Sequence, residues 1–462
     1  MIIGPRGLAD GGPQVRRLSN VNILNHPLGM DPWAAAALGR MTLPPDTFVQ
    51  RLDAGARILR PAGVLDALDG LWMTSSYDRA AAKLNLVPWT GTVTNALTNS
   101  EFVGAAPGVL PDGVTLTGFA AGTGNTYEIQ GVDSVNGQRF IRLRLYGTSV
   151  GVGAVTFNVR SDTNVDIGQR WTSSASVELV SGSWVAGLSA VTLRLNSDGG
   201  GSNFIPGARA QYTNTRVATL ASTAGNLVLR YNTPTATTTP VTYDVVLRIG
   251  MPQLVCMDVP GNYIPTSGAA ASQVQTLYRF DLTEINNPTW TASAPGAPGG
   301  YTGNGTTSYL DTNANPSVDF VRMALNSACY GAWAGLNLTS NGSILGDAAG
   351  AAGVVYIRPR DPGGGVIGRI NSGSGFGIDI ADARGLTVLN RTGPTEAQIY
   401  KNGVNIFQAA PASSTMPTTL HLLRQAIYYP GQISAALAGA SPTPAQHLAA
   451  HQGLAAILGV AA

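Results

Sequence analysis

The sequence predicts a mainly β protein with more than one compact unit, a helical segment in its N-terminal part and a helix at its C-terminal end. Its 462 residues include 57 Gly and 28 Pro, and a chain of this length usually forms more than one domain. Apolar and polar residues alternate over many short stretches separated by turn formers, which is typical of the strands of sandwiches and barrels.

Charge and hydropathy exclude several classes of function. The formal net charge is +2 and only 12% of the residues are charged, so the chain lacks the basic stripe expected of a protein that binds nucleic acid. No apolar run reaches the ~18 residues that membrane insertion needs. The first residues, "MIIGPRGLADGGPQVRRLSN", have no apolar core after their charges, so we expect no signal peptide and synthesis in the cytoplasm.

The two cysteines, Cys256 and Cys329, show no metal-ligand spacing. One disulfide between them is an open alternative, but we expect two buried thiols. Neither residue predicts a metal site.

The N-terminal part changes character near residue 44. Residues 1–40 are punctuated by glycine and proline without a sustained apolar period, which predicts an extended arm that orders against a partner. Apolar residues then recur at near-helical spacing over 48–59, with Asp46 as the expected N-cap. Pro61 interrupts this pattern, and a second short helix is expected over 64–68.

The segment from Thr92 to Gly268 reads as strands and turns. In "RFIRLRLYG" (139–147), Phe140, Arg142, Arg144 and Tyr146 share one face of an expected strand, and the apolar residues between them share the other. The stretches "SASVELV", "AVTLRLN", "NLVLRYN" and "TYDVVLRIG" repeat the pattern. Several short strands with polar turns predict a sandwich or a barrel.

Strand character continues after residue 274, in "GVVYIRPR", "GLTVLNRTG" and "AQIYKNGVNIF". Asn402-Gly403 lies between two alternating segments, which is a strong local signal for a hairpin. Thr443, Pro444 and Gln446 predict the N-cap, the first position and the capping box of a C-terminal helix. Its expected apolar stripe consists of Leu448, Leu454, Ile457 and Leu458.

The segments "GGYTGNGTTSYLDT", "GLTVLNRTG", "AQIYKNGVNIF" and "YYPGQISAALAGASPTPAQHLAAHQGLAAIL" resemble the laminin-G-like, concanavalin-type domains of phage virion proteins. The stretch "LPPDTFVQRLDAGARILRPAGVLDALDGLWMTSSYDRAAAKLNLV" is similar to the helical lead-in of such domains. In that family the lead-in runs directly into a segment like "PTWTASAPGAPGGYTGNGTTSYLDT", whereas residues 88–287 intervene here.

The intervening segment has a resemblance of its own. "NALTNSEFVGAAPGVLPDGVTLTG" and "VVLRIGMPQLVCMDVPGNYIPTSGAA" resemble the opening and the closing strand of carbohydrate-binding-module-like jelly rolls in phage fibres, although the tryptophan usual near Val114 is missing. Together the resemblances imply two β-sandwich (jelly-roll) domains, one inserted in the other. The implied parts are an N-terminal arm for virion attachment over 1–40, a helical lead-in over 41–91, the inserted jelly roll over 92–272, and the laminin-G-like sandwich with its C-terminal helix over 273–462.

Sugar sites place aromatic rings against pyranose faces, with planar polar groups at the rim. The candidate sugar contacts in the jelly roll are Tyr127, Phe140, Arg142, Arg144, Tyr146, Trp171, Trp184 and Tyr231. For each of them, core or edge packing is the alternative. The strand face with two arginines is the most informative, because burying it is costly unless the charges are paired.

Calcium is the only cofactor candidate. Concanavalin-type domains often bind calcium through loop carboxylates, and the resemblance points to Asp379 and Asp382 in "DIADARG", with Asp311 as a weaker candidate. A solvated turn with Arg384 balancing the charge is the alternative.

No catalytic residues are expected. The glycine loop "GNGTTS" lacks the lysine of a phosphate-binding loop. "HLAAH" lacks the glutamate of H-E-x-x-H, so His447 and His451 are expected on the helix surface rather than on a metal. The carboxylates are scattered rather than paired as glycoside hydrolysis requires, and no G-x-S-x-G elbow occurs.

The sequence therefore predicts a non-enzymatic fibre, spike or decoration protein of a tailed phage, located in the virion. Its arm would attach to other virion proteins, and its β domains would bind host-surface polysaccharide. A homotrimer is expected by analogy with other virion fibres. A purely structural head-decoration or collar protein is the first alternative, and a polysaccharide depolymerase is the second.

Overall fold

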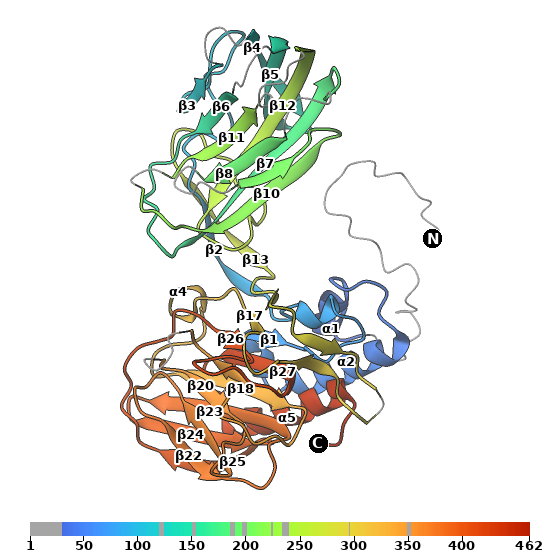
Figure 1. Ribbon diagram of the computed structural model, residues 1–462, viewed down its shortest axis with the longest axis vertical. Helices are drawn as coiled ribbons and strands as arrows, with labels where there is room; N and C mark the ends of the chain where they lie inside the picture. The colour runs from blue at the N-terminus through green and yellow to red at the C-terminus, as the bar shows by residue number, and fades with distance from the viewer. Residues whose placement is uncertain are drawn as a thin grey trace. The chain divides into compact units, whose positions relative to one another are not determined.

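The structure, a computed structural model, describes residues 30–119, 124–149, 154–184, 190–195, 201–222, 225–232, 240–294, 296–348 and 353–462. Within these residues the chain divides into two compact units (Figure 1). The inserted unit is Thr90–Gln275, and the host unit combines 30–89 with Thr276–Ala462. The predicted fold class is confirmed: the chain is mainly β and consists of sandwich domains, one inserted in the other.

The host unit is a sandwich of two antiparallel sheets. The β27 sheet has the order β15-β16-β27-β18-β23-β24-β25, and β1 also pairs with β27; the β20 sheet has the order β14-β17-β26-β19-β20-β21-β22. The strands of the β27 sheet are β1 (Leu68–Trp72), β15 (Thr289–Thr291), β16 (Gly300–Thr302), β18 (Ala328–Ala334), β23 (Gly385–Gly393), β24 (Glu396–Lys401), β25 (Val404–Ala409) and β27 (Gln432–Gly439). Those of the β20 sheet are β14 (Thr283–Ile285), β17 (Tyr309–Asp311), β19 (Leu345–Gly346), β20 (Tyr356–Arg358), β21 (Gly365–Arg369), β22 (Phe376–Asp379) and β26 (His421–Leu422).

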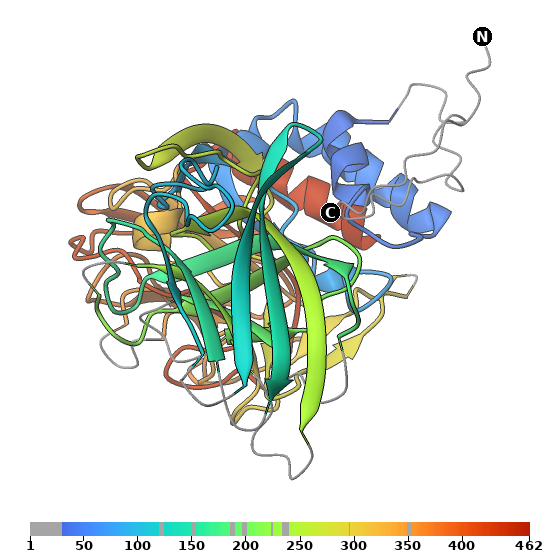
Figure 2. The same ribbon diagram turned by 90° about the horizontal axis from the view of Figure 1, so that it is seen from above.

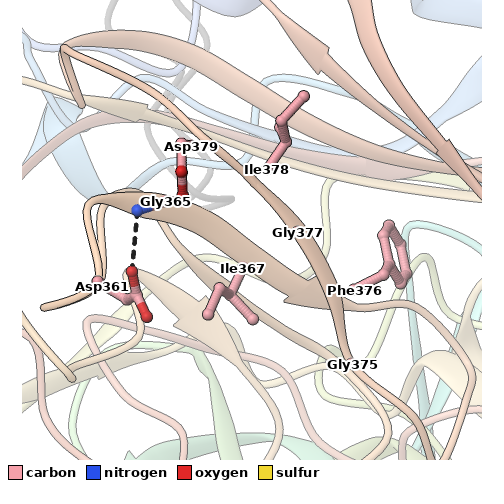
Figure 3. A pocket seen from close by; sticks show the side chains of 9 residues that line it. Asp361, Gly365, Ile367, Gly375, Phe376, Gly377, Ile378 and Asp379 are labelled. Carbon is pink, nitrogen blue, oxygen red and sulfur yellow. Dashed lines mark hydrogen bonds between the residues drawn. The ribbon is translucent and has the colours of Figure 1, made fainter.

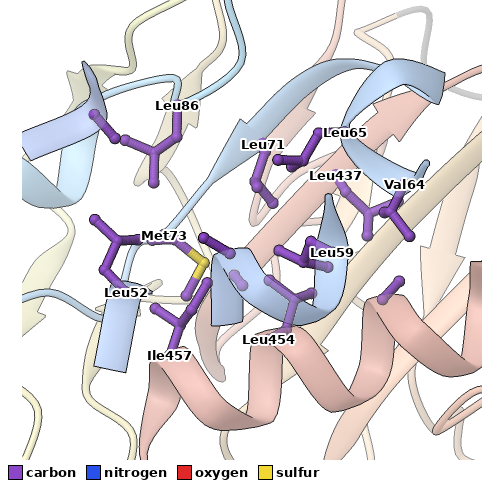
Figure 4. Close-up of a cluster of buried hydrophobic side chains, with 14 of the residues drawn as sticks. Leu52, Leu59, Val64, Leu65, Leu71, Met73, Leu86, Leu437, Leu454 and Ile457 are labelled. Carbon is purple, nitrogen blue, oxygen red and sulfur yellow. The ribbon is translucent and has the colours of Figure 1, made fainter. Parts of the chain in front are cut away.

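Helices pack against the β27 sheet of the host unit. The helical segments are α1 (Pro32–Leu38), α2 (Asp46–Leu59), α3 (Val64–Ala67), the 3-10 turn η2 (Ala81–Lys83), α4 (Pro316–Asp319) and α5 (Pro444–Leu458). Figure 4 shows side chains of α2, such as Leu52, packed with Leu454 and Ile457 of α5 and with Leu437 of β27 in one apolar cluster. Segments from both sides of the insertion therefore share one core.

Two glycines set the closeness of α2 and α5. A Cβ placed on Gly55 would lie 2.3 Å from a side-chain carbon of Ile457 and 2.7 Å from the carbonyl oxygen of Gly453. A Cβ on Gly453 would lie 2.5 Å from Leu59. Only residues without a side chain fit at this crossing, although glycine costs each helix about 1 kcal/mol relative to alanine.

Several local predictions are confirmed in the host unit. Thr443 and Gln446 form the capping box of α5, with Pro444 at its first position. Asn402 and Gly403 connect β24 to β25 with φ angles of 50° and 80°, as the two central residues of a type I′ hairpin turn require. The second short helix forms as α3.

The predicted extended arm is wrong for its described part. Residues 32–38 form α1, whose Trp33, Ala34, Ala37 and Leu38 are buried. Asp31 accepts a hydrogen bond from the N–H of Trp33, and Pro32 occupies the first position. This N-cap and the alanine-rich run outweigh the proline punctuation that suggested an arm. The remainder of the predicted arm, 1–29, lies outside the described residues.

A buried asparagine joins the two host segments on either side of the insertion. Asn85 accepts hydrogen bonds from the N–H groups of Leu71 and Val87, and its amide donates to the carbonyl of Arg279 at 2.9 Å. The N–H of Asn85 donates to Asp281 at 2.8 Å. Asn85 precedes the inserted unit, and Arg279 and Asp281 follow it. These bonds therefore join the segment where the chain leaves the host unit to the segment where it returns.

The inserted unit is a second sandwich of two antiparallel sheets. The β12 sheet has the order β10-β7-β12-β5-β4, and the β11 sheet has the order β3-β6-β11-β8-β9. The strands of the β12 sheet are β4 (Asn125–Val135), β5 (Gln138–Ser149), β7 (Arg170–Ser181), β10 (Ala210–Val217) and β12 (Val241–Val255). Those of the β11 sheet are β3 (Val114–Thr117), β6 (Ala154–Val159), β8 (Val191–Leu195), β9 (Gly201–Phe204) and β11 (Leu227–Asn232). Figure 2 shows the twist of its long strands from above.

The first and last strands of the insertion also meet. β2 (Trp89–Asn95) and β13 (Ala271–Leu277) form a two-stranded sheet. Asn95, the last residue of β2, is buried; its side-chain oxygen accepts from the N–H groups of Leu97 and Leu254, and its amide donates to the carbonyl of Ile264. A second buried asparagine thus closes the inserted unit on itself.

Replacing Asn85 with alanine is expected to destabilise the host unit by about 3 kcal/mol, because the buried N–H and C=O groups that it satisfies lose their partners. Hydrogen exchange of the intact chain measures the effect on host-unit peptides separately from those of the inserted unit. The matched control is Asn405→Ala, since Asn405 is exposed and water can replace the hydrogen bonds that its side chain makes with Phe407 and Tyr400. Equal protection in the two variants would contradict the role assigned to Asn85.

Candidate functional site

A groove of about 700 Å³ crosses one face of the β12 sheet. Its floor consists of small hydroxyl and amide side chains at cross-strand positions. Ser174 and Ser176 of β7 lie opposite Thr213 and Gln211 of β10, and Gln253 of β12 lies opposite Ser174 on the other side. Because paired residues of an antiparallel sheet point to the same face, these groups converge on one surface.

A β-bulge shapes the centre of this floor. The register of β12 against β7 shifts between Gly250 and Gln253. Within the bulge Met251 has a φ of 49°, which is unfavourable for a residue with a side chain. Met251 lines the groove. Bulges are often found next to functional sites, where they redirect a side chain.

The hydroxyl of Ser174 has no hydrogen-bond partner among the described residues, although the side chain is only 1% exposed. Most buried hydroxyls are hydrogen-bonded, since leaving one unsatisfied costs about 1–3 kcal/mol. The floor of the groove therefore holds a buried polar atom whose hydrogen bonding the described residues do not complete.

Amide side chains hold the wall of the groove, which is formed by 260–263. Gln253 donates to the carbonyl of Pro260 and accepts from the N–H of Ile264. Gln275 bonds to both the N–H and the carbonyl of Asn262. The wall is thereby fixed before any ligand arrives, which lowers the entropy cost of binding.

Tyr263 contributes an aromatic ring to this wall. Its hydroxyl donates to Glu101 at 2.6 Å and lies 2.8 Å from the hydroxyl of Ser100. Burial raises the pKa of Tyr263 well above its ordinary value, and the hydrogen bond to Glu101 raises it further. The half-buried ring is therefore held rigidly at the edge of the groove.

The predicted strand face of β5 lies on the same side of the β12 sheet as the groove. Phe140 is buried under Gly250, where an added Cβ would lie 2.3 Å from the ring. Arg144 forms a bidentate ion pair with Asp244, with distances of 2.8 and 2.6 Å, and its guanidinium lies 4.4 Å from the centre of the Tyr146 ring. Hydrogen bonding to Arg144 lowers the pKa of Asp244.

The other arginine of this face, Arg142, lies 3.7 Å from Asp133. Asp133 also pairs with Arg248, which reaches Glu178 as well. The arginines on this strand face are therefore paired with carboxylates, as is expected of charged side chains that are partly buried. They lie beside the groove rather than in it.

The remaining sugar candidates are not brought to the groove. Trp171 and Tyr231 are 3% and 2% exposed in the core between the two sheets, so their rings pack there and are not available to a ligand. Trp184 is partly buried against the same core. Tyr127 is 37% exposed and packs on Gly118.

The host unit has a separate hollow of about 450 Å³ at the edge formed by β21 and β22. Figure 3 shows Asp361 and Asp379 near Gly365, with Phe376 toward the opposite end. Asp361 accepts a hydrogen bond from the N–H of Gly365 at 2.9 Å.

The calcium candidates are not gathered in one place. Asp382 forms an ion pair with Arg384 at 2.6 Å, which lowers its pKa; this is the charge-balanced turn of the alternative interpretation. Asp379 lines the hollow at β22, and Asp311 lies 4.0 Å from His421. Within the described ranges, no group of three or more His, Cys, Asp or Glu side chains is placed to hold a metal ion. Calcium binding remains a prediction.

The prediction that His447 and His451 lie on the surface is wrong. They are 1% and 6% exposed, because the helix face that carries them packs on aromatic residues of the β27 sheet. His447 stacks on Tyr400 with ring centres 3.7 Å apart, and His451 stacks on Trp333 at 5.3 Å. Leu448, which was expected to be buried, is 45% exposed instead.

The cysteine prediction is partly correct. Cys256 and Cys329 form no disulfide, and Cys329 is buried. Cys256 is exposed, since it follows the last residue of β12.

The glycine loop between β16 and β17 is a turn, as predicted. The side-chain oxygen of Asn304 accepts from the N–H groups of Thr306, Thr307 and Ser308. Backbone donors that would otherwise attract an anion are therefore satisfied within the loop. Gly303 packs on the carbonyl of Tyr429, where a Cβ would lie 2.1 Å from the oxygen.

Comparisons with known proteins identify no family. No protein-family model and no curated protein matches the chain. Solved structures give weak similarity only. The enzymatically active domain of tailspike protein 4 from bacteriophage CBA120 aligns with 11% identity and a TM-score of 0.21 over 35% of this chain, which is 21% of that chain.

Two further structures align over longer stretches. The CBM22-1–CBM22-2 tandem domain of Paenibacillus barcinonensis Xyn10C aligns with 11% identity and a TM-score of 0.23, covering 75% of this chain and 99% of that one. The adhesin domain of Epf from Streptococcus pyogenes aligns with 9% identity and a TM-score of 0.20, over 72% and 95%. Similarity at this level carries no argument about function.

No helix in the part of the chain that the structure describes is long and apolar enough to span a membrane.

The sequence pattern does not reveal most of the groove. Its residues come from β5, β7, β10, β12 and the 260–263 segment, and serine, threonine and glutamine carry no distinctive spacing. Of the groove residues, Tyr263 had a signal in the sequence, because it lies in "YIPTSG", part of the segment that resembles the end of phage-fibre jelly rolls.

Acidification is expected to destabilise the host unit. Burial lowers the pKa of His447 to about 4, and burial together with Lys401 lowers that of His451, whereas an unfolded histidine titrates near ~6.5. Folding favours the neutral form of both histidines. Their contribution to the stability of the host unit is therefore complete above pH ~6.5 and is lost as the pH falls toward 4.

Thermal unfolding of the intact chain between neutral pH and pH ~5 measures this dependence. His447→Phe keeps an aromatic ring on Tyr400 and removes one titration, so its melting temperature should fall less steeply with acid. His421, next to Asp311 and Arg424, leaves a residual slope, because its pKa is also lowered to about 4. An identical slope in variant and parent would contradict the assignment.

Proposed function

We propose that this protein is a non-enzymatic virion component of a tailed phage or phage-like particle, and that its inserted unit binds host-surface glycan in the groove on the β12 sheet. The observation that carries the proposal is the preformed groove itself, whose lining gathers serine, threonine and glutamine side chains from three neighbouring strands on one face of the sheet. Polyols are ligands rich in hydroxyl groups, and a floor of serine, threonine and glutamine offers both donors and acceptors to them. The sequence resemblance to phage-fibre jelly rolls supports the same class of ligand.

The groove supports binding rather than catalysis. Among the described residues that line it there is no carboxylate and no histidine, and these are the groups that glycoside hydrolysis and most acid–base chemistry use. The rigid wall at 260–263 and the tyrosine ring beside it suit recognition of a sugar chain. We therefore propose a spike or fibre that adsorbs to a polysaccharide without cleaving it.

The rest of the particle context belongs to the same proposal. The N-terminal residues would attach the protein to other virion proteins, and a homotrimer would present several grooves at once, which raises avidity for a repeating polymer. The protein would be made in the cytoplasm of the host and act in the virion.

A second candidate function is a purely structural decoration or collar protein. One observation favours it: Ile167 and Leu220 are 69% and 62% exposed on two loops of the inserted unit that bond to each other through Gly168 and Ala218. Neighbouring exposed apolar side chains are typical of protein-binding surfaces. Ile167→Asp with Leu220→Asp would yield unstable particles if this function holds, and intact particles if the surface is not used.

The depolymerase alternative has its own test. The carboxylates beside the hollow at β21 and β22 are Asp361 and Asp379. Release of reducing ends from host capsule, abolished in Asp361→Asn or Asp379→Asn, would establish it. We expect no release by the parent chain.

Changes to the floor of the groove are expected to weaken glycan binding. Ser174→Leu places an isobutyl group in the floor, and Gln211→Ala removes an exposed amide from it; each should weaken binding to the polysaccharide by about tenfold or more. An array of bacterial polysaccharides, probed with the full chain, identifies the ligand and measures the loss.

The matched control is Ser181→Leu, the same change on the same strand at an exposed position outside the groove. Gln211→Ala keeps the test valid if Ser174→Leu does not fold. Undiminished binding by Gln211→Ala and by a folded Ser174→Leu would exclude the groove, and a parent chain that binds no polysaccharide would exclude the glycan-binding function.

A further inference from the structure

The β20 sheet of the host unit carries two arginines that rest on tyrosine rings. The guanidinium carbon of Arg424 lies 4.6 Å from the centre of the Tyr309 ring and 5.4 Å from that of Tyr428. The guanidinium carbon of Arg358 lies 5.0 Å from the centre of the Tyr356 ring. Each ring restricts the orientation of the guanidinium above it, because the positive charge is attracted to the electron-rich face of the ring.

Strand register places these groups on one face of the sheet. His421 of β26 pairs with Gly346 of β19, which in turn pairs with Tyr356 of β20. Paired residues of antiparallel strands point to the same face, and so do residues two apart along one strand, so Arg358 shares the face of His421. Tyr309 joins them from β17, because its ring centre lies 4.8 Å from that of His421. Since two strand spacings separate His421 from Tyr356, their backbones are roughly 9–10 Å apart.

This arginine–tyrosine face consists of Tyr309, Tyr356, Arg358, His421, Arg424 and Tyr428.

The two arginines, Arg358 and Arg424, form no ion pair with a carboxylate among the residues that the structure describes. Both are partly buried, and the Nε of each has no hydrogen-bond partner there. A charged group that is partly removed from water is stabilised by a counter-charge. Arg369, which also lies over Tyr356, donates to the carbonyl of Gly353 at 2.9 Å, and we assign it no part in binding.

Neighbouring carboxylates limit the kind of anion that the face accepts. Asp311 lies 4.0 Å from His421 at one end, and Asp361 and Asp379 line the hollow of the adjoining strands β21 and β22. A strand of nucleic acid carries a charge on every residue, so it meets repulsion from these carboxylates as well as attraction from the arginines. A polysaccharide with occasional acidic sugars places neutral rings between its charges, which suits two cations separated by uncharged groups.

We infer that the arginine–tyrosine face binds an acidic polysaccharide through two of its carboxylates, one at Arg424 and one at Arg358. The planar fork of an arginine pairs with a carboxylate through two parallel N–H donors, which adds both energy and orientation. The half-buried rings of Tyr309 and Tyr428 offer apolar surface and hydroxyl groups to the sugar rings beside the acid. This second binding surface belongs to the host unit and does not depend on the groove of the inserted unit.

The test measures binding of the full chain to hyaluronan, in which neutral and acidic sugars alternate, and to the same polymer after reduction of its carboxylates to alcohols. Biolayer interferometry gives both affinities. We expect the parent chain to bind the native polymer about tenfold more tightly, since reduction removes charged hydrogen-bonded pairs. The double variant Arg358→Gln with Arg424→Gln should bind both forms equally weakly. Arg424→Gln alone should lose part of the preference, and it serves as the test if the double variant does not fold.

Arg384→Gln is the matched control, since it makes the same change in the host unit at an exposed position outside this face. It should keep the preference for the native polymer, and so should Gln211→Ala in the groove, which separates the two binding surfaces.

Three results overturn the inference: equal binding of both polymers by the parent chain, an undiminished preference in a folded variant that lacks Arg424, or an equal loss in Arg384→Gln. Tighter binding of oligothymidylate than of hyaluronan also overturns it, because the face then suits a nucleic acid strand. Binding of another polysaccharide that Gln211→Ala weakens leaves the proposed function intact in each case.

Discussion

The hydrogen bonds of Asn85 hold together the two points where the chain leaves and re-enters the host unit, and the whole architecture depends on that junction. The side chain of Asn85 reaches the main chain of Arg279, and its N–H reaches Asp281. Arg40 extends the junction by pairing with Asp281. The entropy cost of closing a loop rises only slowly with its length. Bonds that are strong enough to close a short loop at this position can therefore also hold the two chain segments together when a whole domain is inserted between them.

Asn95 performs the equivalent closure inside the insertion, and it does so next to the candidate site. Its amide donates to the carbonyl of Ile264, the residue that follows Tyr263 of the groove wall. Gln253 accepts from the N–H of the same Ile264. The bonds that seal the domain ends thus also set the position of the wall, which links folding of the unit to the preorganisation of its groove.

Local signals predicted the elements whose stabilising contacts are close in sequence. The capping box of α5 involves residues three apart, and the Asn402-Gly403 turn needs only two residues with positive φ. The alternation in 139–147 placed Ile141, Leu143 and Leu145 in the core, where they are buried. Asp31 and Pro32 carried a similar helix-start signal for α1, which the glycine and proline content of 1–40 obscured.

The sequence by itself determined the mainly β class, the start of α5 and the Asn402-Gly403 hairpin, because a few neighbouring residues encode each of them. Only the tertiary structure decided that His447 and His451 are buried, that Trp171 belongs to the core, and that the serines of β7 face the same groove as Gln211 and Gln253. The physical reason is register: a strand pattern says which residues share a face, but the partner strand and the bulge at Met251 decide what that face meets.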